Sequence, residues 1–73
     1  MSIKISDNFM CLEVGGEVIA IATRRPDFWW EVSHWPRFFD RNQAITALTV
    51  TELLSEGFSS DDPLVVTSRE ELR

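Results

Sequence analysis

The Gly15–Gly16 pair constrains the fold more than any other feature of the sequence, because it joins two runs that favour β-strands. Residues 9–14 precede the pair, and residues 17–23, rich in valine, isoleucine and alanine, follow it. A two-residue turn of type I′ needs a positive φ at both central positions, which glycine adopts without steric cost. The sequence therefore predicts an antiparallel β-hairpin. Its second strand is apolar at almost every position and should lie centrally in a sheet.

A third β-prone run contains the three tryptophans of the chain, at positions 29, 30 and 35. Pro26 and Asp27 favour a turn just before this run, and Pro36 closes it. We therefore expect a third strand and a three-stranded antiparallel meander, which residues 37 and 38 could extend.

Strand geometry separates the aromatic side chains of this run into two groups, since successive side chains point to opposite faces of a sheet. Trp30 shares one face with Phe28 and Val32, and this face suits the core. Trp29 and Trp35 share the other face with polar neighbours. Two indoles on a partly polar face indicate contact with a partner rather than chemistry.

Residues 41–56 contain no glycine or proline and are predicted to form one long helix. Asp40 and Gln43 have the spacing of a capping box at its start. Gly57 is the expected residue after its end, where Phe58 closes a Schellman motif. A meander followed by a helix packed on one face of the sheet predicts an α+β fold.

This helix carries more apolar surface than one sheet face needs. One arc packs on the sheet and contains Ala44, Ala47, Leu48, Val50, Thr51 and Leu54. Ile45 and Leu53 lie outside it, on a second line at helical spacing. Three interpretations stay open for that line: cover by the C-terminal segment, an interface with a second copy or another protein, and simple exposure to solvent.

The C-terminal segment carries conflicting signals. Asp62 and Pro63 suit the N-cap and first position of a helix, whereas residues 64–67 prefer a strand. Ser68 and Glu71 form a second capping box. We expect an extended stretch over residues 64–67 followed by a helical turn, with residues 1–73 forming a single domain.

Composition restricts the classes of function. The chain has 73 residues, a net charge of −5 and a single cysteine, Cys11, which excludes an internal disulfide and fits a reducing compartment. No apolar run approaches the length of a membrane span, and the N-terminus is not a secretory signal. We expect a cytoplasmic protein without membrane contact.

No residue pattern supports catalysis or a cofactor. His34 is the only histidine, and one histidine with one cysteine is too few for a zinc site. No phosphate-binding glycine motif is present. We therefore predict no enzyme activity, no catalytic residue, no metal and no cofactor.

The leading hypothesis is a small protein–protein interaction or regulatory module, because tryptophan and arginine are over-represented in interface hot spots. It predicts a dimer of the chain or binding to another protein. The residues expected to contact the partner are Trp29, Trp35, Arg24, Arg25, Arg37, Ile45 and Leu53.

Two alternatives remain. Trp29 and Trp35 with the nearby arginines could stack on the bases of a nucleic acid, although the acidic net charge opposes binding to phosphate. An acidic decoy or inhibitor of a nucleic-acid-binding protein would instead use the negative second half of the chain, where the acidic residues are Glu52, Glu56, Asp61, Asp62, Glu70 and Glu71.

A resemblance covers about the last 33 residues. The pattern consists of residues 41–48, Thr51-Glu52-Leu53-Leu54, Gly57, Asp62-Pro63 and Arg69-Glu70-Glu71-Leu72. It resembles short accessory proteins of actinobacterial phages and integrative elements. The resemblance implies a mobile-element protein that acts on a host or phage partner, and it implies no activity and no site residue.

Overall fold

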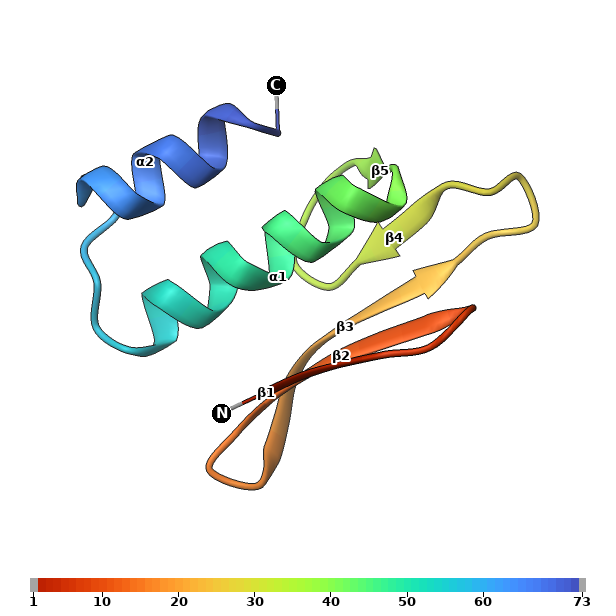
Figure 1. Ribbon diagram of the computed structural model, residues 1–73, viewed down its shortest axis with the longest axis horizontal. Helices are drawn as coiled ribbons and strands as arrows, with labels where there is room; N and C mark the ends of the chain where they lie inside the picture. Colours follow the sequence, from red (N-terminus) through yellow and green to blue (C-terminus); the bar gives the residue numbers. More distant parts are fainter. Residues whose placement is uncertain (1, 73) are drawn as a thin grey trace.

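The chain folds into an open five-stranded antiparallel sheet with one helix across one face and a second helix on the first (Figure 1). The computed structural model describes residues 2–72. The strands follow one another in the sheet in chain order. The elements are β1 (Ser2–Ile5), β2 (Phe9–Val14), β3 (Glu17–Arg24), β4 (Trp30–Val32), β5 (Phe38–Phe39), α1 (Arg41–Ser55) and α2 (Pro63–Glu70).

The predicted hairpin is confirmed. Gly15 and Gly16 have φ values of 60° and 84°, and Val14 pairs with Glu17 across a two-residue turn. β3 lies between β2 and β4, as its apolar sequence predicts. A register shift opposite Leu12 and Glu13 interrupts the pairing of β2 with β3.

The sheet has five strands rather than the three expected from the sequence. β1 adds to the outer edge of β2, where Ile3 pairs with Leu12 and Ile5 pairs with Met10. A tight turn joins these strands, in which the Ser6 N–H donates to the Phe9 carbonyl at 2.8 Å. The opposite edge gains β5, a two-residue strand paired with β4. Both additions are short, so neither produces a strong sequence signal.

The tryptophan run forms a much shorter strand than expected. The predicted division of its side chains between two sheet faces therefore holds only in part. Trp30 and Val32 are buried in the core, as predicted. Phe28 was expected beside them but is 71% exposed, with φ 70°. The chain leaves the strand after Val32 and turns at His34, where φ is 69°. Trp35 therefore packs against the core instead of sharing a face with Trp29.

α1 confirms the expected helix and its caps. The Asp40 carboxylate accepts from the Gln43 N–H at 2.8 Å, and the Gln43 side chain accepts from the Asp40 N–H at 3.2 Å. Gly57 has φ 95°, and the Phe58 N–H donates to the Leu53 carbonyl as a Schellman motif requires.

The core lies between α1 and one sheet face. The buried residues from the sheet are Met10, Leu12, Ala20, Ala22, Trp30, Val32 and Phe39, and those from α1 that pack on them are Ala44, Ala47 and Leu48. Val50 is also buried, whereas Leu54, expected on the same arc, is 37% exposed.

The expected extended stretch over residues 64–67 is wrong, because this segment belongs to α2. The Asp62 carboxylate caps the helix by accepting from the Leu64 N–H at 3.0 Å, and Pro63 takes the first helical position. α2 packs against α1, where Val65 is fully buried. The helix cap at Asp62 and the burial of Val65 against α1 thus outweigh the preference of the valines for a strand.

Candidate binding surface

The sheet face opposite α1 is uncovered among residues 2–72, and it carries exposed apolar side chains among polar ones. Cross-strand pairing places Phe9, Thr23, Glu31 and Phe38 in one continuous row on this face. We call it the open face. Its large apolar side chains are 38–54% exposed, and they are Phe9, Val18, Ile21, Trp29 and Phe38. Several large apolar side chains exposed on the same face of a small domain favour a binding surface.

The end of the open face near β1 carries an ion pair and the side chain of Cys11. Lys4 and Glu13 form an ion pair at 2.9 Å, and the hydrogen bond to Glu13 raises the pKa of Lys4. Cys11 lies beside them and is buried, as expected for a small apolar residue. It borders a hollow of about 180 Å³ at the β1–β2 turn.

The loop between β3 and β4 holds an arginine against exposed aromatic rings. The Arg25 Nε donates to both carboxylate oxygens of Asp27, at 3.2 and 3.3 Å. The guanidinium carbon of Arg25 lies 4.0 Å from the ring centroid of Phe38, in cation–π contact. The Arg25 N–H also donates to the Trp29 carbonyl at 2.7 Å, which extends the strand pairing into the loop. Arg25, Trp29 and Phe38 thus form one end of the open face.

Asp27 fixes the conformation of this loop. Desolvation opposes its ionisation, but hydrogen bonds from the Arg25 guanidinium and the Trp29 N–H outweigh that effect and hold the pKa of Asp27 below its ordinary value. The carboxylate is therefore charged at neutral pH, and it compensates the charge of Arg25.

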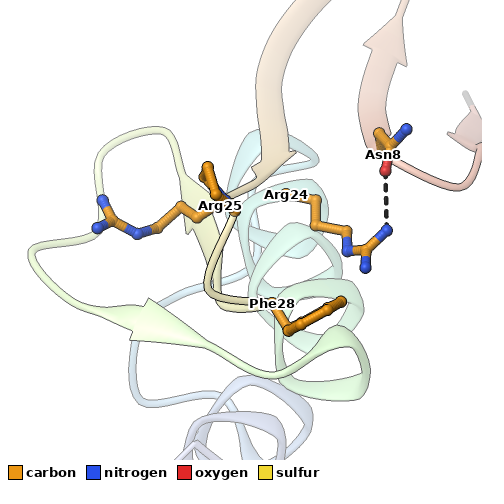
Figure 2. A pocket seen from close by; sticks show the side chains of 5 residues that line it. Asn8, Arg24, Arg25 and Phe28 are labelled. Atoms are coloured by element: carbon orange, nitrogen blue, oxygen red, sulfur yellow. Dashed lines mark hydrogen bonds between the residues drawn. The ribbon is translucent and has the colours of Figure 1, made fainter.

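A pocket of about 360 Å³ adjoins the loop and is lined by Asn8, Arg24, Arg25, Pro26 and Phe28. Figure 2 shows the Arg24 side chain reaching toward Asn8 above the Phe28 ring, while the Arg25 side chain points the other way. The Arg24 guanidinium donates to the Asn8 amide oxygen at 3.0 Å, and its central carbon lies 4.6 Å from the Phe28 ring centroid.

The structure brings together three of the residues predicted to contact a partner, and it separates the other four. Arg24 ends β3, Arg25 and Trp29 lie in the β3–β4 loop, and the two arginines line its pocket. Trp35 packs edge-on against Phe39, with ring centroids 5.5 Å apart.

The remaining predicted residues do not reach the open face either. The Arg37 guanidinium carbon lies 5.0 Å from the ring of Phe39, a core residue, so Arg37 covers the core. Ile45 packs against the core and Leu53 is half-buried on α1. α2 packs on the same helix, which favours cover by the C-terminal segment over a free second apolar line.

Sequence reasoning missed Phe9, Val18, Ile21, Phe38 and Asn8 as surface residues of interest. A signal existed for part of this set, because alternation along β2 and β3 exposes every second side chain once one face is assigned to the core. The register shift between β2 and β3 hides this alternation near Val18. Asn8 has no such signal, because the β1–β2 turn alone brings it next to Arg24.

Residues 2–72, the part of the chain that the structure describes, show neither a metal centre nor a membrane-spanning helix. This part contains no group of three or more His, Cys, Asp or Glu residues arranged to hold a metal ion. Neither of its helices has the length and apolar character needed to cross a membrane. Comparisons with protein-family models, curated proteins and solved structures found no match.

Proposed function

We propose that the chain is a small non-enzymatic binding module that contacts a partner protein through its open face and the adjoining β3–β4 loop. The observation that carries this proposal is the sheet itself, covered by α1 on one face while the other presents five exposed apolar side chains. Burial of such side chains against a partner supplies about 25 cal/mol for each Å² removed from water.

The composition of the loop end supports a protein partner in particular. Trp29 and Phe38 provide large rigid apolar surface, and Arg25 stacks on Phe38. Aromatic residues and arginine are enriched at the energetic centres of protein interfaces. The proposal places the module in the cytoplasm, where Cys11 stays reduced, and a host or phage partner remains the prediction from the resemblance.

An affinity capture experiment with matched variants tests the proposal. The wild-type chain, Ile21→Glu and Leu64→Glu are immobilised and exposed to nuclease-treated and untreated cell lysates. Ile21 lies on the open face, whereas Leu64 is an exposed apolar residue of α2. We expect a retained protein that Ile21→Glu loses and Leu64→Glu keeps.

Three outcomes contradict the proposal. Retention that disappears after nuclease treatment favours the nucleic-acid alternative. Equal loss with both glutamate variants indicates a non-specific apolar effect. Absence of any retained protein from the wild-type chain argues against a protein-binding role.

A further inference from the structure

The guanidinium of Arg24 is held in place with most of its donors unused. It forms one hydrogen bond, to the Asn8 amide oxygen, and its plane is backed by the Phe28 ring. The Arg24 backbone N–H also donates to the Asn8 carbonyl at 3.0 Å, so two bonds join these residues. A guanidinium has five N–H donors, and fixing it beforehand reduces the entropy lost when a ligand binds.

The two adjacent arginines differ in charge compensation. Arg25 is paired with Asp27, and the other ion pair among residues 2–72 joins Lys4 to Glu13. Arg24 takes part in neither, and its one side-chain partner, Asn8, is neutral. The pocket therefore presents an uncompensated positive charge beside an exposed aromatic ring.

We propose that this pocket binds a single carboxylate side chain that stands beside an apolar residue on the partner protein. Arg24 is the group that donates to the carboxylate, and Phe28 is the surface on which the apolar neighbour packs. The inference rests on the proposed function and names the chemistry that the partner offers where it reaches past the end of the open face. Arg24 pairs with the core residue Trp30, so its side chain lies on the α1 side of the sheet, whereas Arg25 contacts Phe38 on the open face. Arginine suits this role because its planar donors match the two carboxylate oxygens.

A peptide with a single carboxylate fits the pocket better than a nucleic acid. Affinity for nucleic acid grows with the number of phosphates neutralised, and this site offers one uncompensated guanidinium. The chain as a whole carries a net charge of −5, and Asp27 and Glu31 lie in or next to the loop. These charges repel a phosphate backbone but tolerate a single carboxylate at Arg24.

The hairpin connection explains the backbone at Phe28 and fixes the position of its ring. The Phe28 N–H donates to the Arg25 carbonyl at 3.0 Å, and the Arg25 N–H donates to the Trp29 carbonyl at 2.7 Å. This is the pattern of a tight turn followed by one residue in the left-handed region, and Phe28 has φ 70°. The turn thus holds the 71% exposed Phe28 ring against Arg24.

Nuclear magnetic resonance titration with defined peptides tests the proposal. The probes are short Gly/Ser peptides with a central Leu-Glu-Phe or a central Leu-Gln-Phe, and a single-stranded oligothymidylate. We expect the Leu-Glu-Phe peptide to shift the Arg24 Nε–H and Asn8 side-chain amide signals, and the Leu-Gln-Phe peptide to bind at least about tenfold more weakly.

Two variants and one control define the site. Arg24→Gln should weaken binding of the Leu-Glu-Phe peptide by at least about tenfold, whereas Arg41→Gln, the same loss of charge at the start of α1, should leave binding unchanged. Phe28→Gly removes the ring and the steric strain together. It should weaken binding while the midpoint of urea unfolding stays the same or rises, which a merely structural role would not produce.

Equal binding of the two peptides, tighter binding of the oligothymidylate, or equal losses in Arg24→Gln and Arg41→Gln would each overturn the carboxylate site. Failure of the pocket can be distinguished from failure of the proposed function, which the capture experiment tests by itself. If Ile21→Glu abolishes capture of the partner while Arg24→Gln has no effect on capture or on peptide binding, the open face binds a protein and the pocket does not contribute.

Discussion

The neighbouring arginines where β3 ends and the β3–β4 loop begins differ because each makes a different side-chain contact. Arg25 donates to both oxygens of Asp27 and lies over Phe38, which fixes the loop and its backbone. Arg24 is oriented by a neutral amide and keeps its charge for an external group. The sequence predicted both residues as partner contacts. It could not distinguish their roles, because the contact that orients Arg24 comes from Asn8 in the β1–β2 turn, which is distant in sequence.

The Arg25–Asp27 contact predicts a dependence of stability on pH. The folded-state pKa of Asp27 lies below the ordinary value of 3.8, so its contribution is complete above that value and is lost as the pH falls through the folded pKa. We expect the unfolding free energy of the wild type to exceed that of Asp27→Asn at about pH 6, and the difference to shrink toward about pH 2. Urea unfolding followed by circular dichroism at both pH values measures it, and a difference that grows on acidification would contradict the assignment.

At the level of elements, the sequence predicted correctly those features that depend on interactions within a few residues. The Gly15–Gly16 turn and the caps of α1 follow from backbone conformation and hydrogen bonds within a few residues, and both are confirmed. β1 was missed because Ser2–Ile5 is short and is stabilised by pairing with β2 rather than by its own sequence. The residues of the open face were predicted only in part, because the sequence argument assumed a regular strand through His34, where the backbone turns.

α2 illustrates how packing decides between two local preferences, and it yields a test. Val65 is fully buried, whereas Val66 on the same helix is 39% exposed. Val65→Ala should lower the unfolding free energy by about 2 kcal/mol, from lost burial and the cavity left behind. Val66→Ala should change it by less than about 0.5 kcal/mol. Chemical denaturation of both variants measures the contrast, and equal tolerance of the two changes would show that α2 does not pack on α1.

At the level of the whole molecule, the fold is a thin slab of about 34 × 30 × 16 Å. The core occupies the space between α1 and one sheet face, and α2 lies on the side of α1 away from the sheet (Figure 1). No element among residues 2–72 covers the remaining face. The molecule thus combines an exposed apolar face, which favours association, with a net charge of −5, which opposes contact between copies.

These opposed forces predict how the isolated chain associates with itself as salt is added. Added salt screens the repulsion between two copies that each carry a charge of −5, while the attraction between apolar faces persists. The average mass in light scattering should therefore rise toward that of a dimer as sodium chloride increases. Ile21→Glu should stay monomeric throughout, because it places a charge at the centre of the open face, whereas Leu64→Glu should behave like the wild type. Association that weakens with salt would instead identify an ionic interface, with the acidic residues of the second half bound to the few uncompensated arginines.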